Sequence, residues 1–421
     1  MDTRYEKSVD LFRRATRVIP TGIYGFKSPL ASLPGVGPYY TARAEGSRFW
    51  DVDGNEYIDF LCGYGPVVLG HCDPTVEAAV RDAAAAGVCW NQPGENMVEL
   101  AEKFVELIGP ADWAVFGKNG VDMTTWALQV AREHTLRSKV IITAGAYHGA
   151  LPWCTASRAG VTPEDRTNTL EMQWNDIDSL ERLIADHPGE IAAVMLTPYH
   201  HAFAGRQVMP NDGFWAQVRR ICDREGIVLI LDDVRAGFRL GLHGSHEIFG
   251  IEPDLICYSK AIGNGYPIAA GVGTEALRSA AEAVFATGTY WYSAVPMAAS
   301  LAVFRVLEET DALDRLSRLG TRWAEGLERL AAESGFRVSV TGPPGLSYMT
   351  FDDDPNLYLM QVFAAEMITH GVFLPPYHHT FLTAAHTDDD IDQALEVAAD
   401  AFRVTEQAID HLPIQLESTR R

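Results

Sequence analysis

The chain of 421 residues is 47% hydrophobic and carries 34 Lys and Arg against 56 Asp and Glu, a formal net charge of −22. Its length allows about two domains with a large buried core, and its acidic charge argues against nucleic acid or an anionic membrane as a partner. Because the six cysteines form no CxxC pair and the sequence shows neither a signal peptide nor a membrane-spanning apolar run, we expect a cytoplasmic protein.

The first 60 residues predict a helix followed by a β-hairpin. Residues 1–20 have an amphipathic pattern that Pro20 and Gly22 end. The segment RFWDVDGNEYIDF (48–60) alternates apolar and polar residues around an Asp-Gly turn, which is typical of a hairpin. We expect this N-terminal segment (1–60) to form part of a small domain.

From about residue 75 to residue 300, short apolar runs alternate with amphipathic helices such as FWAQVRRICDREG (214–226). The apolar runs occupy residues 114–116, 139–143, 191–196, 227–233 and 254–259. Continuous apolar strands separated by helices indicate a mostly parallel sheet that is covered on both faces. The sequence therefore predicts a large α/β domain over residues 61–300.

The C-terminal part, residues 301–421, predicts the rest of a small α+β domain. A long helix is expected over 300–335, followed by strand-like pieces and a last helix introduced by TDDDIDQAL (387–395). The acidic residues in the first turn of that last helix suit a helix N-terminus. No linker of biased composition marks a boundary between the domains.

Two polar residues directly follow predicted buried strands. Asp232 comes after IVLIL, and Lys260 follows DLICYS and opens the Gly-rich turn AIGNGYP. Ligands of open α/β sheets bind at the carboxyl ends of strands, where a buried charge must find a partner or lose its charge. One interpretation is a helix-capping aspartate and a surface lysine. The other is a pyridoxal 5'-phosphate (PLP) site, which explains both residues together.

The chain resembles the class III aminotransferases, and most closely their glutamate-1-semialdehyde aminomutase branch. The resemblance rests on LDDVRAGFR (231–239) and YSKAIGNGYPIAAGVG (258–273), with further matches at GHCDP (70–74), AYHG (146–149) and TAAHTDDDID (383–392). It implies a fold-type I homodimer with active sites shared between subunits. In that family pattern Lys260 carries PLP as a Schiff base, and Asp232 holds the ring nitrogen in its protonated form.

The resemblance also implies further cofactor contacts. The segment GKNGVDMTT (117–125) precedes a helix, so Asn119 and the backbone N–H groups of Gly120 and Val121 are expected at the phosphate. Tyr147 occupies the position of an aromatic ring stacked on the cofactor, next to His148. Thr289 occupies the position of a hydroxyl donated to the phosphate by the neighbouring subunit. Taken alone, Tyr147 and Thr289 are also compatible with ordinary packing and turn positions.

The chain departs from the aminomutase branch at its expected substrate pocket. The branch's phosphate loop carries a threonine that is missing here, and TGIYGFKSPL (21–30) lacks the branch's carboxylate-binding arginine. Lys27 is the only basic residue there, and a lysine is a poorer bidentate partner for a carboxylate. Substrate contacts are therefore predicted for Lys27 and Tyr24, together with His378 and His379. The histidines show no zinc-type spacing with carboxylates, so no metal is expected.

These observations predict an aminotransferase that moves nitrogen from an amino acid to an aldehyde or ketone without a carboxylate. An oxidised aminoglycoside sugar of an antibiotic pathway fits an acceptor that is neutral or cationic. An alternative is an isomerase, either an aminomutase or an epimerase, that needs no external donor. A structural protein that merely binds PLP or a nucleotide is disfavoured, since no GxGxxG follows the first strand and Asp232 and Lys260 are both present.

Overall fold

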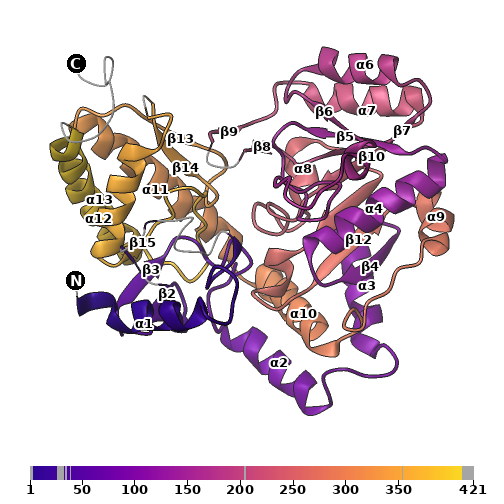
Figure 1. The fold of residues 1–421 in the computed structure, drawn as a ribbon. Helices are drawn as coiled ribbons and strands as arrows, with labels where there is room; N and C mark the ends of the chain where they lie inside the picture. Colours follow the sequence, from indigo (N-terminus) through magenta and orange to yellow (C-terminus); the bar gives the residue numbers. More distant parts are fainter. Residues whose placement is uncertain are drawn as a thin grey trace. The chain divides into compact units, whose positions relative to one another are not determined.

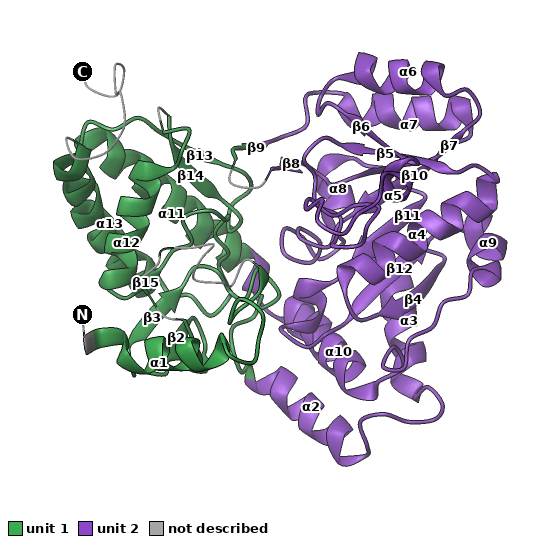
Figure 2. Ribbon diagram, in the orientation of Figure 1, with its two compact units in different colours: residues 1–73, 203–207, 314–421 green, residues 74–202, 208–313 purple. Residues whose placement is uncertain are grey.

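The structure is a computed structural model that describes residues 3–25, 33, 36–37, 39–202, 205–352 and 354–409. The chain forms two compact units (Figure 2). Unit 1 comprises residues 1–73, 203–207 and 314–421, and unit 2 comprises residues 74–202 and 208–313. The units divide the chain at other positions than the expected boundaries at 60 and 300, since residues 61–73 belong to unit 1 and residues 301–313 to unit 2. A boundary at 300 would cut α10 (Ala294–Glu309), which packs along its length on helices of unit 2.

Unit 2 is built on a seven-stranded sheet with the order β4-β12-β11-β10-β7-β5-β6. Its strands are β4 (Trp113–Gly117), β5 (Lys139–Thr143), β6 (Thr169–Met172), β7 (Ile191–Leu196), β10 (Val228–Asp232), β11 (Leu255–Tyr258) and β12 (Ala269–Gly273). Strand β12 runs antiparallel to both of its neighbours, and the other pairings are parallel. The predicted mostly parallel sheet is thus confirmed.

Helices cover the sheet of unit 2 (Figure 1). Helix α4 (Gly120–Thr135) buries Met123 and Trp126 against Met195, Ile230 and Cys257 of the sheet. Helices α6 (Ile177–Asp186) and α7 (Phe214–Glu225) contact each other and pack on β6 and β10. Strands β7, β10 and β11 are buried along their whole length, which explains why each reads as a continuous apolar run.

The remaining helices of unit 2 lie at its periphery or in its loops. They are α2 (Pro74–Ala85), α3 (Glu95–Leu107), α5 (Pro163–Arg166), α8 (Ser245–Phe249) and α9 (Arg278–Ala283), with the short 3-10 helices η4 (Lys260–Gly263) and η5 (Glu275–Leu277). Helix α10 packs on α2 and α3. Over the described ranges, every helix is too short or too polar to cross a membrane.

Unit 1 combines a small sheet with four helices. The sheet has the order β1 (Thr41–Glu45), β2 (Arg48–Asp51), β3 (Glu56–Asp59), β15 (Val372–Phe373), and a separate pair joins β13 (Val338–Thr341) to β14 (Tyr348–Phe351). Its helices are α1 (Glu6–Ala15), α11 (Ala312–Glu333), α12 (Tyr358–Thr369) and α13 (Asp388–Ala408). Strands β2 and β3 form the hairpin predicted around the Asp-Gly turn.

Two helix predictions need correction. The expected helix over 1–20 is limited to α1, which is preceded by a 3-10 turn at Thr3–Tyr5. The expected single helix over 300–335 is two helices, α10 and α11, which separate at Thr310. That residue leaves the helical conformation with φ −131° and ψ 170°, and its hydroxyl accepts the N–H of Ala312 at 3.3 Å. A threonine side chain that bonds to nearby backbone in this way favours a helix boundary.

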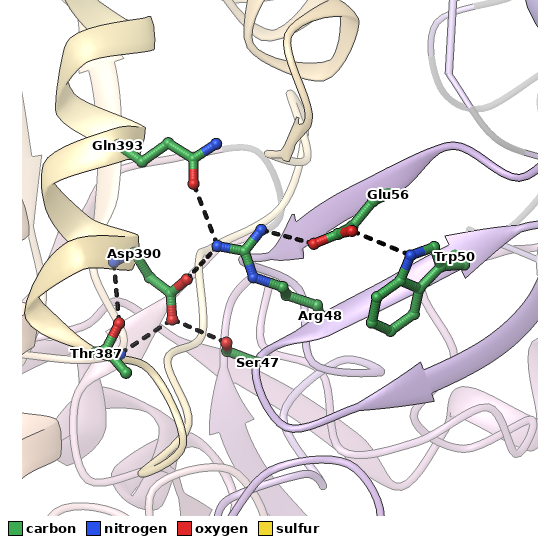
Figure 3. A network of polar contacts seen from close by, with 7 residues as sticks. All are labelled: Ser47, Arg48, Trp50, Glu56, Thr387, Asp390 and Gln393. Carbon is green, nitrogen blue, oxygen red and sulfur yellow. Dashed lines mark hydrogen bonds and ion pairs between the residues drawn. The ribbon is translucent and has the colours of Figure 1, made fainter.

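A polar network joins the two ends of the chain within unit 1 (Figure 3). The Asp390 carboxylate, at the start of α13, accepts hydrogen bonds from Ser47 Oγ at 2.9 Å and from Arg48 Nη2 at 2.6 Å. It also accepts the backbone N–H of Thr387, whose hydroxyl in turn caps the helix by accepting the N–H of Asp390. Arg48 additionally contacts Glu56 at 2.9 Å. This network connects strand β2 to the last helix.

Candidate active site

Lys260 and Asp232 lie at the same edge of the unit 2 sheet, as the sequence predicts. Asp232 is the last residue of β10 and pairs in register with Cys257 of the neighbouring parallel strand β11. Lys260 follows β11 and opens η4 with a φ of +52°, a left-handed conformation that few non-glycine residues adopt. Left-handed backbone of this kind costs about 1–2 kcal/mol and is often found at functional positions.

The Asp232 carboxylate is buried, and each of its oxygens has a hydrogen-bond partner. One oxygen lies 2.7 Å from His148 Nδ1, and the other accepts the N–H of Val234 at 3.2 Å. His148 is itself buried, and its carbonyl accepts the hydroxyl of Thr124 from helix α4 at 2.8 Å. Because a buried carboxylate must be compensated, this arrangement fixes the position of Asp232. His148, predicted as a cofactor contact, here contacts Asp232.

The Lys260 amine has an unusually low proton affinity. Burial, together with the positive charges of Arg235 and Arg239 and against the opposing effect of Asp232, lowers its pKa to about 8. A larger fraction of the amine is therefore uncharged near neutral pH than for an exposed lysine. An uncharged amine is the form that can attack a carbonyl carbon.

The sequence analysis missed three groups near Lys260. Arg235 and Arg239, in the loop after β10, are buried. His201, in β8 (His200–His201), has a pKa held well below 6.5 by burial and by the charges of Arg235 and Lys260. The sequence does contain a signal for Arg235, because a charged residue lies three positions after the aspartate that ends the strand.

The start of helix α4 provides the predicted phosphate-binding backbone. Asn119 is the N-cap residue, and the Asp122 carboxylate accepts the N–H groups of Lys118 at 3.0 Å and Asn119 at 2.8 Å. Gly120 and Val121 lie in the first turn, where backbone donors have no acceptor within the helix. Such a helix N-terminus favours an anion.

Glycines bring this helix start close to the other parts of the site. A Cβ atom on Gly120 would lie 2.8 Å from Val234 Cγ1, two residues after Asp232. A Cβ atom on Gly149, just after His148, would lie 2.2 Å from Val121 Cγ2. Only glycine permits these approaches, so the first turn of α4, the loop after β10 and the AYHG segment converge on one place.

Lys118 is a second buried amine at the start of α4. Its Nζ has no hydrogen-bond partner among the described residues. Burial lowers its pKa to about 8, against the raising effects of Asp122 and Cys89. The sequence analysis assigned no role to Lys118.

Tyr147 is accessible beside the buried carboxylate. Its side chain is 51% exposed, and burial of the remainder, together with Cys154 and Asp232, raises its pKa. Thr289 lies in the loop before α10, where its carbonyl is 3.9 Å from Cys89 Sγ. Exposed Phe285, Tyr290 and Tyr292 surround it in the sequence.

Three of the predicted substrate residues, Tyr24, His378 and His379, lie in the described part of unit 1. Tyr24 is 78% exposed, and Lys27 lies outside the described residues. The His378 ring contacts Tyr64 edge-on with a centroid distance of 5.0 Å, and His379 is buried with its ring 5.0 Å from that of Tyr348. Their role in substrate binding stays a prediction. Within the described ranges, no group of three or more His, Cys, Asp or Glu side chains could hold a metal ion.

The fold and the paired amine and carboxylate at its sheet edge define a PLP-dependent enzyme of fold type I. A family model described as "Aminotransferase class-III" matches residues 33–402, and the chain belongs to this family. It is a PLP-dependent aminotransferase.

Individual relatives support this assignment. An aminopentol aminotransferase of Sphingopyxis macrogoltabida is 42% identical over 393 residues, which cover 93% of each chain. A glutamate-1-semialdehyde 2,1-aminomutase of Desulforamulus reducens is 32% identical over 96% of this chain and 99% of that one. The PLP internal aldimine form of the FumI protein of Sphingopyxis sp. MTA144 superposes with a TM-score of 0.94 and 41% identity, covering 97% of this chain and 98% of that one.

The described residues fit PLP. Lys260 offers an amine of low pKa for the cofactor aldehyde, and Asp232 offers a carboxylate for a protonated ring nitrogen. The helix start at Gly120, together with the buried and unpartnered amine of Lys118, provides positive potential for a phosphate. The aldehyde, the ring nitrogen and the phosphate of the cofactor therefore each have a complementary group in unit 2.

Proposed function

We propose that Lys260 is the catalytic residue of this aminotransferase and Asp232 its ring-nitrogen partner. The observation that carries this proposal is the Lys260 amine of lowered pKa, placed beside the anchored Asp232 carboxylate. When bound, PLP supplies an electron sink that stabilises negative charge on the carbon next to the donor nitrogen. Asp232, held by His148, keeps the proton on the ring nitrogen that this chemistry requires.

Lys260 would have two roles with PLP bound. Its nitrogen would hold the cofactor until an amino donor displaces it, and its amine, then free, would serve as the base that moves a proton away from the donor carbon. The backbone N–H groups at Gly120 and Val121, in the first turn of α4, would hold the phosphate, and the accessible ring of Tyr147 would stack on the cofactor.

We infer that the carbonyl acceptor lacks a carboxylate and carries hydroxyl groups. Two observations support this inference: the segment 21–30 contains no arginine, and a relative at 42% identity acts, by its name, on an aminopentol, an amine with several hydroxyls. An oxidised aminoglycoside sugar of an antibiotic pathway is one molecule of this class. That narrower substrate, like the cytoplasmic location, stays a prediction from the sequence.

We also propose a homodimer in which Thr289 reaches the partner's phosphate. The loop around Cys89 contacts the loop around Thr289, and Ser293 Oγ donates to the Val88 carbonyl at 3.0 Å. Large apolar side chains are exposed on both loops, among them Val88, Trp90, Phe285, Tyr290 and Tyr292. Contiguous exposed apolar surface of this kind is typical of a subunit interface. Sedimentation equilibrium showing a monomer that binds PLP tightly would contradict this proposal.

The test is to follow the absorbance of the PLP-loaded protein near about 420 nm while single amino donors are added. Loss of the band with release of a keto acid supports the aminotransferase half-reaction and identifies the donor. A second candidate, an aminomutase, is favoured by the relative at 32% identity. It is indicated instead if one substrate is isomerised without release of any keto acid.

A further inference from the structure

Three neighbouring strands of unit 2 bring basic side chains to the edge of the sheet where Lys260 lies. Strand β10 lies between β7 and β11, and all three run parallel. Arg235 and Lys260 each follow the register pair Asp232–Cys257 by three residues. His201 comes five residues after the end of β7. The topology therefore places an arginine and a histidine beside the proposed catalytic lysine.

The electrostatic effects agree with this placement. Arg235 is, after burial, the largest influence on the pKa of both Lys260 and His201, and it lowers both. A guanidinium stays protonated over the whole working range of pH, so Arg235 is a permanent buried positive charge.

The carboxylates of Asp232 and Asp233, at the end of β10 and the start of the following loop, already have hydrogen-bond partners. Asp232 is held by His148. Both oxygens of Asp233 accept from Ser245, one from its hydroxyl at 2.6 Å and one from its N–H at 2.9 Å. Burial raises the pKa of Asp233 to about 7, against those hydrogen bonds, so its negative charge is only partly present at neutral pH. The sheet edge near Lys260 thus has a positive potential suited to an incoming anion.

We propose that Arg235 binds the carboxylate of the amino-acid donor and is a specificity-determining residue of the reaction. In an α-amino acid the carboxylate is attached to the carbon whose nitrogen must replace that of Lys260. A group that recognises this carboxylate must therefore lie close to Lys260, and Arg235 follows β10 by three residues just as Lys260 follows the register-paired position of the neighbouring β11. The planar guanidinium matches a carboxylate with two parallel hydrogen bonds. This inference rests on the proposed function of Lys260.

The inference also accounts for the missing arginine in segment 21–30. One active site must accept two substrates in turn, a donor with a carboxylate and an acceptor without one. An arginine near Lys260 would face the groups close to the reacting carbon rather than the far end of either substrate. The rest of the pocket is then free to fit a neutral hydroxylated chain, whose hydroxyl oxygens can accept hydrogen bonds from the same guanidinium.

The test compares two amines that differ only in the carboxylate. L-Alanine and isopropylamine share a carbon skeleton, except that a methyl group replaces the carboxylate in the second. We expect R235Q to lower the ratio of their half-reaction efficiencies by about 30-fold or more, as for removal of one partner of a buried charge pair. R235K, which keeps the charge but loses the planar fork, should give an intermediate ratio. An unchanged ratio in R235Q overturns the proposal.

A binding measurement gives a readout besides activity. L-Lactate carries the carboxylate but no amine, so its affinity for the PLP-loaded protein by calorimetry reports carboxylate recognition alone. A fall of similar size in R235Q supports the proposal, and an equal affinity in the wild type and R235Q overturns it. Loss of the absorbance band in R235Q would also overturn it, because Arg235 would then act on the cofactor. Absence of the band in the wild type would instead refute the role of Lys260.

Discussion

The two units differ in how far they compensate a buried charge. In unit 1, the buried Asp390 carboxylate meets Arg48, Ser47 and the first turn of α13, and these hydrogen bonds outweigh the effect of burial and lower its pKa. In unit 2, burial and a neighbouring guanidinium hold the pKa of Lys260 well below its ordinary value. A paired charge stabilises the fold, whereas a poorly compensated charge is available for binding and chemistry.

The largest expected effect is on catalysis. K260M removes the nucleophilic amine and keeps the side-chain volume, so we expect amino transfer to fall by about 10⁴-fold or more. The absorbance band of the covalently held cofactor should disappear. R48M in unit 1 is the matched control, because it removes a cation that is paired with a carboxylate. This variant should retain the band. Amino transfer by K260M at a rate near that of the wild type would refute the assignment.

The same substitution should have the opposite effect on stability. In cofactor-free protein at pH 7, K260M removes a buried amine whose pKa falls from 10.5 to about 8 on folding, so unfolding should cost up to about 3 kcal/mol more. This advantage is complete below pH 8. It shrinks as the pH rises from about 8 to 10.5, because there the unfolded chain binds a proton that the folded wild type does not. Urea titrations at pH 7 and pH 10 measure the difference, and equal shifts at both values would contradict it.

Removal of the paired cation Arg48 should have the opposite effect on stability, because it should destabilise the fold. R48M leaves the buried Asp390 without its cation, and we expect a loss of about 2 kcal/mol, discounted because Arg48 is partly exposed. Asp390 has a lowered pKa, so its contribution is present above its ordinary pKa of 3.8 and is lost as the pH falls below that value. The difference between R48M and the wild type should therefore shrink in acid. A difference that grows in acid would show that Asp390 is not the partner that matters.

The smallest expected effect concerns an uncharged contact. Y147L removes the ring beside Asp232 and should weaken PLP binding by about three- to tenfold, corresponding to about 1 kcal/mol of stacking. Y147F keeps the ring and should bind PLP nearly as the wild type does. Fluorescence titration of the cofactor-free protein compares the three. Equal weakening in both variants would assign the effect to the hydroxyl.

The architecture of unit 2 could be predicted because each buried strand is a continuous apolar run, and the residues after β10 and β11 stood out by their charge. The division between the units could not, since α10 continues smoothly across residue 300 and nothing in its composition marks a boundary. No role was predicted for Arg235, because the residues on either side of it in the sequence are apolar and give no sign of a binding site. Its closeness to Lys260 comes from the register of β10 and β11, which no local pattern discloses.

The division of the chain has a consequence for its synthesis on the ribosome. Unit 1 combines residues 1–73 from the beginning of the chain with residues 314–421 from the end. Asp390, the partner of Arg48, is therefore synthesised 342 residues after Arg48. At the usual rate of translation that delay is about 20–70 s. Strand β2 therefore leaves the ribosome long before its partner helix exists, while every strand of the unit 2 sheet has been made before residue 314.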